Sequence, residues 1–304
     1  MKKIDTLDKL IATVKKTENI PTLPKVLTKI SEEIDNDNFS IKNIGDLMSR
    51  DVSLSARILK IVNSPFYGFP QRIYSINHAI VLLGANVLKS IVISTSVFTA
   101  MKETMTGLSE HSLFCAFASK HISQEINKSI KKTGETGKLK SNDKKQQQTV
   151  DPDNMFAVGL LHDIGKIIIA TTFKEDFKAI LETAQKEEKP LEKVEHDILN
   201  ISHDQLGYML VKEWNLPSSI YIPIKYHHNP ALADDFKKET AILNIADFLT
   251  RAMGVGFSGS TYLEKINTDS MNILGINIDF IKSAIEEIYL YKDELNIFDY
   301  PNKN

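Results

Sequence analysis

Apolar side chains recur at helical spacing along most of this chain, a pattern that predicts a fold built from amphipathic helices. The spacing is clearest at Val26, Leu27, Ile30 and Ile34, at Ile44, Leu47 and Met48, and at Leu54, Ile58, Leu59 and Val62. Asp51 and Ser53 can cap the last of these segments, and Asn63-Ser64-Pro65 can end it. We therefore expect an all-α protein with helices of about 10 to 15 residues.

A strand is the competing interpretation only between Ile76 and Phe98, where Ile, Val and Leu are abundant. The stretch is interrupted at Leu83-Gly84-Ala85, but it shows neither strict alternation nor a hairpin dipeptide. Its apolar positions fit helical faces on both sides of the glycine. We predict two buried helices here.

Composition narrows the class of protein and its partners. A chain of 304 residues, 42% hydrophobic and 25% charged, can form one large domain or two modest ones. A net charge of -2 argues against nucleic acid or an anionic membrane as the main partner. The single cysteine, Cys115, excludes an internal disulfide framework, and neither a signal-peptide core nor an apolar stretch of about 20 residues is evident. We expect a cytoplasmic protein without a transmembrane helix.

The segment from Lys128 to Asp153 differs from its surroundings because it has almost no large apolar residue. Such a composition buries too little surface to offset the entropy of ordering, so we expect a disordered insertion between two helices. A solvated basic loop is favoured over a nucleic-acid-binding arm, because the segment has no aromatic residue and no arginine.

One short motif, Gly159-Leu160-Leu161-His162-Asp163-Ile164-Gly165-Lys166, carries an adjacent imidazole and carboxylate. Such a pair suits manganese, iron or zinc. His111 and Asp247 each lie in an apolar helical segment, where a buried polar group needs a partner. Singly, each has an ordinary explanation, a satisfied core histidine or an ion pair such as Asp247 with Arg251. Together with the motif they predict a metal site that leaves room for a reactive water.

Further histidines can extend this site. His203 and the pair His227-His228 can hold a second ion bridged by Asp163, and Lys166 can hold a phosphate oxygen. The alternative for His227-His228 is a favourable position at a helix C-terminus, since Asn229-Pro230 follows.

The order of His111, His162-Asp163 and Asp247 resembles the metal-dependent HD phosphohydrolases. The chain more specifically resembles the HDOD family, the HD-related output domains of bacterial signalling proteins. The segments that carry this likeness are Leu23-Pro24, 51–64, 76–84 and Trp214-Asn215-Leu216-Pro217. The resemblance implies an HDOD domain over 16–255, in which an N-terminal helical bundle (16–105) packs on an HD-like bundle (106–255), with 256–304 as a C-terminal helical extension.

The resemblance also implies a regulatory role, because HDOD members are generally regarded as output or scaffold modules. We predict a stand-alone signalling protein that binds partner proteins and holds one or two divalent ions. The alternative is a phosphohydrolase acting on a cyclic dinucleotide or nucleotide, as in the related HD-GYP enzymes. The Gly-Tyr-Pro segment of those enzymes is replaced here by Asn229-Pro230-Ala231-Leu232-Ala233. A sensor that binds such a phosphate ligand without turnover is a third possibility.

Overall fold

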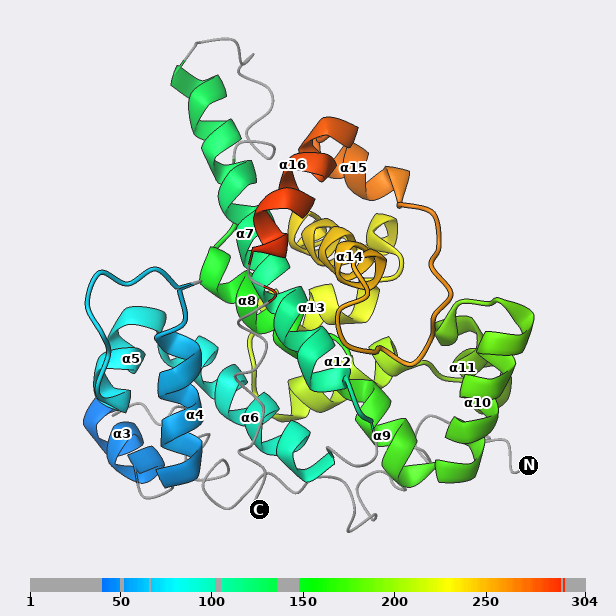
Figure 1. The fold of residues 1–304 in the computed structure, drawn as a ribbon, viewed down its shortest axis with the longest axis horizontal. Coiled ribbons are helices and arrows are strands. Elements are labelled where there is room, and N and C mark those ends of the chain that lie inside the picture. The colour runs from blue at the N-terminus through cyan, green and yellow to red at the C-terminus, as the bar shows by residue number, and fades with distance from the viewer. Residues whose placement is uncertain are drawn as a thin grey trace.

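The structure, a computed structural model, describes residues 40–49, 52–65, 67–101, 105–135, 148–290 and 292. Every regular element within these ranges is helical, as Figure 1 shows, which confirms the predicted all-α class. The predicted helix around Val26 to Ile34 and the prolines before it lie outside the described residues, as does the predicted cap Asp51.

The N-terminal part consists of α3 (Ile41–Ser49), α4 (Val52–Val62), α5 (Ile76–Leu83) and α6 (Ala85–Met101). The chain between Ile76 and Phe98 thus forms two helices rather than strands, as predicted. The Ser75 side chain caps α5 by accepting from His78 N–H, and Gly84 ends it with a φ of 80°. Helix α6 packs against both α4 and α8, so it joins this part to the rest of the molecule (Figure 1).

The larger part surrounds α7 (Leu108–Glu135), α8 (Pro152–Leu161) and α14 (Lys237–Ala252). Helices α9 (Ile164–Thr172), α12 (His203–Glu213) and α13 (Ser218–Tyr226) pack beside them. Two glycines allow close helix contacts. A Cβ on Gly159 would lie 2.7 Å from Ala116 Cα in α7, and one on Gly165 would lie 1.9 Å from the His203 carbonyl oxygen of α12.

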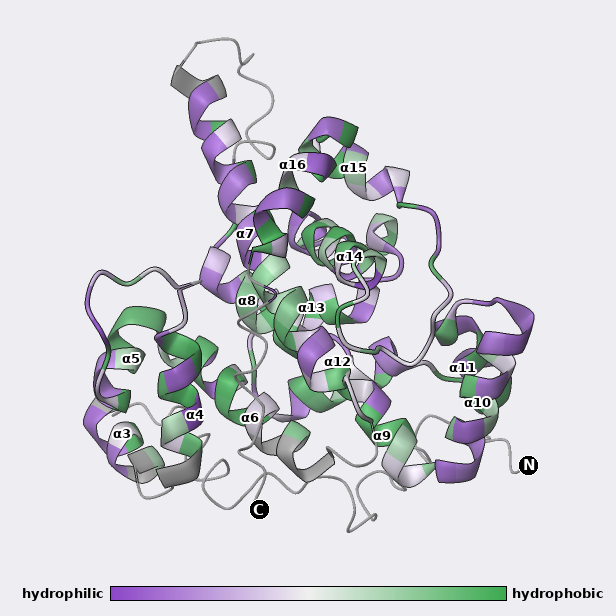
Figure 2. Ribbon diagram, viewed as in Figure 1, coloured by the Kyte–Doolittle hydropathy of each residue, from purple (hydrophilic) through white to green (hydrophobic). Residues whose placement is uncertain are grey.

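Helices α10 (Lys174–Glu187) and α11 (Leu191–Leu199) form a hairpin at one end of the molecule, at the right of Figure 1. Figure 2 shows hydrophilic residues on much of their surface. Their inner faces share a small apolar core with α9 and the start of α12. Its buried members include Ile168, Phe177, Ile180, Val194, Leu199 and Leu206.

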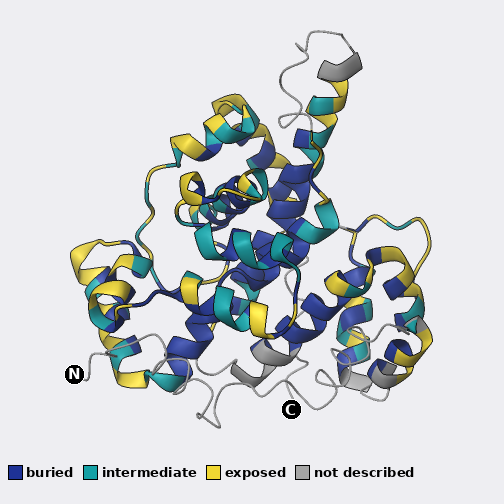
Figure 3. Cartoon of the chain, turned by 180° about the vertical axis from the view of Figure 1, so that it is seen from behind, coloured by how far each residue is buried: buried dark blue, intermediate teal, exposed yellow. Residues whose placement is uncertain are grey.

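The expected disordered insertion at 128–153 is shorter at both ends than predicted. Helix α7 continues through Glu135, and the mostly exposed residues 128–132 (Figure 3) explain why a polar sequence there is compatible with a helix. At the other end, Val150 is buried and exchanges two hydrogen bonds with the Asn127 side chain, at 2.7 and 3.0 Å. Asp151 then caps α8. Residues 136–147 lie outside the described residues.

The segment Pro152–Thr172, which spans α8 and α9, is apolar and long enough by composition to cross a membrane. It is longer than any apolar stretch considered in the sequence analysis. However, 94% of its most apolar window is buried inside the protein, as the dark ribbon in Figure 3 indicates. Its apolar character is that of a core element, and it carries the His162-Asp163 motif.

The short 3-10 helix η1 (Pro230–Leu232) precedes α14. After α14 the chain runs without regular structure from 254 to 267. Helices α15 (Thr268–Leu274) and α16 (Ile278–Tyr289) follow. Helix α15 packs on α14 and α16 packs on α7. His121 of α7, which the sequence analysis did not single out as a ligand, lies with its Nε2 3.1 Å from Glu287 Oε2 of α16.

Candidate metal centre

The predicted ligands converge from distant parts of the chain. His111 lies on α7, His162 and Asp163 occupy the junction of α8 and α9, and His203 is the first residue of α12. His227 and His228 follow α13, and Asp247 lies on α14. All are buried except His228, which is partly exposed.

The first group of side chains comprises His111, His162, Asp163 and Asp247. His111 Nε2 lies 3.1 Å from Asp247 Oδ1 and 3.3 Å from His162 Nε2. Asp163 Oδ2 lies 3.4 Å from both of these imidazole nitrogens. The ligand atoms of His111, His162 and Asp247 all lie within 4.8 Å of one another, which is compact enough for a single ion.

The second group comprises His203, His227 and His228, whose ligand atoms also lie within 4.8 Å of one another. His203 Nε2 is 2.9 Å from His228 Nε2 and 3.3 Å from Asp163 Oδ1. Asp163 therefore directs Oδ1 toward the second group and Oδ2 toward the first. This is the arrangement that a bridging carboxylate requires.

Hydrogen bonds on the far side of three rings determine which nitrogen faces the centre. The Nδ1–H of His162 donates to the Gly159 carbonyl at 2.8 Å, and that of His227 donates to the Ile224 carbonyl at 2.7 Å. Nδ1 of His203 lies 2.6 Å from Glu195 Oε2. A carbonyl can only accept, so His162 and His227 carry their proton on Nδ1 and turn the Nε2 lone pair inward, as metal-binding histidines do.

Glu195 is a site residue that the sequence analysis did not identify. It lies on α11, is fully buried, and accepts from both the backbone N–H and the ring of His203 through Oε2. Its signal in the sequence is weak, a single glutamate among the apolar residues Leu191, Val194 and Leu199 that form the buried face of α11. Only packing of α11 against α12 reveals its role.

Burial and neighbouring charges move the pKa values of these groups in different directions. Burial lowers the pKa of His227 to about 4 and that of His228 well below its ordinary value. For His203, burial acts downward, but the Glu195 carboxylate outweighs it and the pKa rises to about 9. Burial raises the pKa of Asp163, yet His162 and Lys166 outweigh it, so the pKa falls well below the usual range. Burial also raises the pKa of Asp247, but hydrogen bonds with His111 and His162 outweigh this effect, so the pKa falls well below its usual range.

The cluster fits a divalent cation. His227 Nε2 is buried and has no hydrogen-bond partner among the described residues, although its lone pair faces the second group. A buried acceptor without a donor costs about 1–3 kcal/mol, a penalty that a bound cation removes. Imidazoles and carboxylates together are the donor set of manganese, iron and zinc.

Lys166 is positioned differently from the expectation. Its Nζ donates to Asp163 Oδ2 at 2.6 Å, and the side chain is buried. The ammonium group is therefore engaged with the central carboxylate, and the role predicted for it with a phosphate oxygen stays a prediction.

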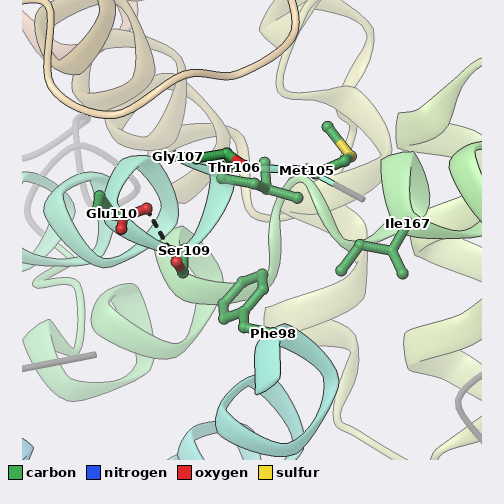
Figure 4. Close-up of a pocket in the computed structure, with 8 residues that line it drawn as sticks. Phe98, Met105, Thr106, Gly107, Ser109, Glu110 and Ile167 are labelled. Atoms are coloured by element: carbon green, nitrogen blue, oxygen red, sulfur yellow. Dashed lines mark hydrogen bonds between the residues drawn. The ribbon is translucent and has the colours of Figure 1, made fainter. Parts of the chain in front are cut away.

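Two cavities lie near the start of α7. One, of about 230 Å³, is lined by His111, Arg251 and the segment after α14. The other, of about 20 Å³, is shown in Figure 4 and is lined by none of the predicted ligands; its lining includes Phe98, Met105, Glu110 and Ile167. Gly107 lines the smaller cavity, and its carbonyl accepts from the backbone N–H of Phe257, which lines the larger one, at 3.0 Å. Only the larger cavity reaches the cluster.

Comparison with known proteins identifies relatives of this chain. A sequence model described as the HDOD domain matches residues 20–230. A protein of Treponema pallidum (strain Nichols), described as uncharacterized, is 24% identical over 250 residues, which make up 82% of this chain and 45% of that protein. The chain thus spans less than half the length of this relative.

Solved structures share the fold. An HDOD domain protein of unknown function from Geobacter sulfurreducens is 23% identical, with a TM-score of 0.66 and coverage of 95% of this chain and 99% of that one. A candidate signal transduction protein from Marinobacter aquaeolei VT8 is 18% identical, with a TM-score of 0.69 and coverage of 96% and 65%. A candidate metal-dependent phosphohydrolase from Shewanella amazonensis SB2B is 17% identical, with a TM-score of 0.57 and coverage of 95% and 97%.

Proposed function

Because the chain belongs to the HDOD family of signalling-type domains, we propose that it is an HDOD protein with a functional two-metal centre, which hydrolyses phosphate esters. The observation that carries this proposal is the position of Asp163, whose Oδ2 lies 3.4 Å from His111 Nε2 and whose Oδ1 lies 3.3 Å from His203 Nε2. The names of the structural relatives from Shewanella amazonensis agree with such an activity.

The first ion would be held by His111, His162, Asp163 and Asp247, and the second by Asp163 and the three remaining histidines of the cluster. Iron, manganese and zinc are the candidates. When bound, such a pair polarises a phosphoryl oxygen and lowers the pKa of water enough to supply a nucleophile near neutral pH.

The protein's own groups prepare this centre. Lys166 and the surrounding imidazoles keep the Asp163 carboxylate ionised, because they lower its pKa. Glu195 holds the His203 ring with Nε2 directed inward. These side chains are buried, so their charges act at low dielectric.

Metal content and turnover test the proposal together. Protein purified without a metal-binding tag should contain close to two equivalents of iron, manganese or zinc. It should hydrolyse at least one member of a panel of phosphate monoesters, nucleotides and cyclic dinucleotides. Asp163→Asn should lose most of the metal and the hydrolysis together, whereas the exposed control Asp279→Asn should retain both. Metal-loaded wild type without turnover on the whole panel would contradict the enzymatic proposal.

A second function is favoured by exposed apolar side chains on the N-terminal part. Tyr74, Val81 and Leu82, in and just before α5, are 78%, 65% and 40% exposed. All three lie within residues 74–82, and a contiguous exposed apolar patch is typical of a protein-binding site. We propose that this surface binds a signalling partner in the cytoplasm, in parallel with or instead of catalysis.

Replacement of these three residues by serine tests the surface directly. The triple variant should keep the wild-type melting temperature and metal content but lose partners captured from the native cell. Capture of the same partners by wild type and variant would contradict a role for this surface.

A further inference from the structure

The cavity of about 230 Å³ is the one near the start of α7 that includes a predicted ligand, His111, in its lining. His111 forms part of its wall and also lies 3.1 Å from Asp247. The remaining wall comes from the end of α14 and from the irregular segment that follows it, shown in Figure 1 as the long strap between α14 and α15. A molecule in this cavity would therefore touch the first group of ligands.

Arg251 stands at the boundary between the cavity and the metal centre. It lies one helical turn after Asp247, and its Nη1 is 3.8 Å from Asp247 Oδ2. Its Nη2 donates to the Tyr262 carbonyl, a contact that ties the irregular segment to α14. Its Nε is buried and has no hydrogen-bond partner among the described residues, and Arg251 is part of the cavity lining.

The other groups around the cavity favour an anion. The lining contains no aspartate or glutamate, and it contains the serine and threonine residues Ser258, Ser260 and Thr261. Apolar side chains complete it, and two of them, Phe257 and Leu263, are 42% and 41% exposed. A single guanidinium with hydroxyl-bearing residues and an apolar rim matches an anionic group attached to a small apolar or ring-shaped body.

The size of the cavity limits that body. Pockets for drug-sized ligands have volumes of about 300–1,000 Å³, and this cavity lies just below that range. It can hold one phosphate and a small attached group, but a cyclic dinucleotide carries two phosphates and two bases. Among the substrate classes that the sequence left open, the cavity volume therefore favours a small phosphate ester over a cyclic dinucleotide.

We propose that this cavity is the phosphate-binding subsite for a small phosphate monoester, with the Arg251 guanidinium as the group that contacts the phosphate. The proposal rests on the phosphohydrolase function proposed above and specifies its substrate class. It also assigns Arg251 a binding role in addition to its position beside Asp247.

Binding of inorganic phosphate tests the subsite without relying on turnover. Calorimetry on the full chain, with manganese and after chelator treatment, should show saturable binding to the wild type. Arg251→Gln should weaken it by about tenfold or more, the usual effect of losing a charged hydrogen bond. Arg251→Lys, which keeps the charge but loses the planar fork, should lie between them, and the exposed control Arg72→Gln should match the wild type. Metal content of each variant is measured in parallel, because Arg251 adjoins a candidate ligand.

Kinetics on the manganese-loaded protein give the second readout. With p-nitrophenyl phosphate, Arg251→Gln should raise KM and the inhibition constant of phosphate by similar factors, about tenfold, with a smaller change in kcat. Turnover with unchanged KM and unchanged phosphate inhibition in both Arg251 variants would overturn the subsite and leave the phosphohydrolase function standing.

If the proposed phosphohydrolase function is wrong but the subsite is right, the measurements give a different pattern. Arg251-dependent phosphate binding without turnover of any ester would support the subsite and contradict the hydrolysis. No phosphate binding by the wild type in either metal state, or binding of equal strength in Arg251→Lys and Arg251→Gln and the wild type, would overturn the subsite. Hydrolysis of cyclic dinucleotides in preference to every monoester would also overturn it.

Discussion

At the scale of single residues, the candidate site depends on groups that orient the ligands as much as on the ligands. Asp163 can face two groups of histidines because Lys166 and the imidazoles compensate its charge. His203 can face inward because Glu195 engages the opposite ring nitrogen. A carboxylate that holds a ligating histidine raises its basicity and fixes its ring, so its loss weakens metal binding even though it never touches the ion.

Glu195→Gln is expected to lower the affinity for the second ion by about 10- to 100-fold, the usual effect of losing such a carboxylate. Affinity for the first ion should change little, because Glu195 contacts only His203 among the predicted ligands. Titration with a competing metal chelator measures both constants. The exposed control Glu182→Gln should behave as wild type, and equal affinities in all three proteins would exclude an orienting role for Glu195.

Glu192 gives a prediction on pH. Burial raises the pKa of this carboxyl from 4.5 to about 7, assisted by Glu264. The unfolded chain thus releases the proton before the folded protein does, so stability falls as pH rises from about 4.5 to about 7 and stays reduced above that range. Glu192→Gln should remove the penalty and stabilise the protein at pH 8 by about 1–2 kcal/mol.

Urea unfolding of chelator-treated protein at pH 8 and at pH 4.5 measures this difference. Wild type and Glu192→Gln should converge at the lower pH, where the wild-type carboxyl is protonated in the folded and partly in the unfolded state. If Glu192→Gln stabilises the protein as much at pH 4.5 as at pH 8, the charge of the Glu192 carboxylate is not the cause of the lower wild-type stability.

At the scale of helices, two close contacts between helices fix the position of the His162-Asp163 motif. Gly159 brings α8 against α7, and Gly165 brings α9 against the first turn of α12. The second contact sets His203 beside Asp163, because His203 is the residue whose carbonyl Gly165 approaches. The glycine of the motif therefore positions the second group of ligands through packing.

Gly165→Ala tests this contact. Its Cβ would lie 1.9 Å from the His203 carbonyl oxygen, so α9 and α12 must separate. We expect a loss of about 1–3 kcal/mol in unfolding free energy, as for other overpacked sites, and weaker binding of the second ion. Gly207→Ala on the same interface is the matched control, since its Cβ would lie no nearer than 3.3 Å to any neighbour, and that nearest neighbour is the Ile224 side chain. Equal effects of the two substitutions on stability and metal affinity would contradict this account.

At the scale of the molecule, the centre lies where α7, α8, α9, α12, α13 and α14 meet. These helices contribute buried carboxylates and imidazoles that the folded chain brings together and the unfolded chain separates. A cation that binds only the folded arrangement stabilises it by mass action. Metal binding and global stability should therefore be linked.

Removal of metal is expected to lower the melting temperature by about 5 °C or more relative to protein at a free metal concentration 100-fold above its dissociation constant. That ratio contributes about 2.7 kcal/mol. Differential scanning calorimetry with stepwise additions of manganese measures the shift, which should grow with the logarithm of the metal concentration. In Asp163→Asn the shift should disappear, and a shift of the same size in that variant would point to metal bound elsewhere.

The amino-acid sequence alone determined the all-α class, the paired helices between Ile76 and Phe98, and the residue types able to bind a metal, because helical periodicity and side-chain chemistry are local properties. It misjudged the ends of the 128–153 insertion, where the Asn127 side chain exchanges two hydrogen bonds with the Val150 backbone. Tertiary structure decided the rest. Only packing brings Asp163 between two groups of histidines, puts Glu195 behind His203 and sets Arg251 on the cavity wall, since these contacts join helices far apart in sequence.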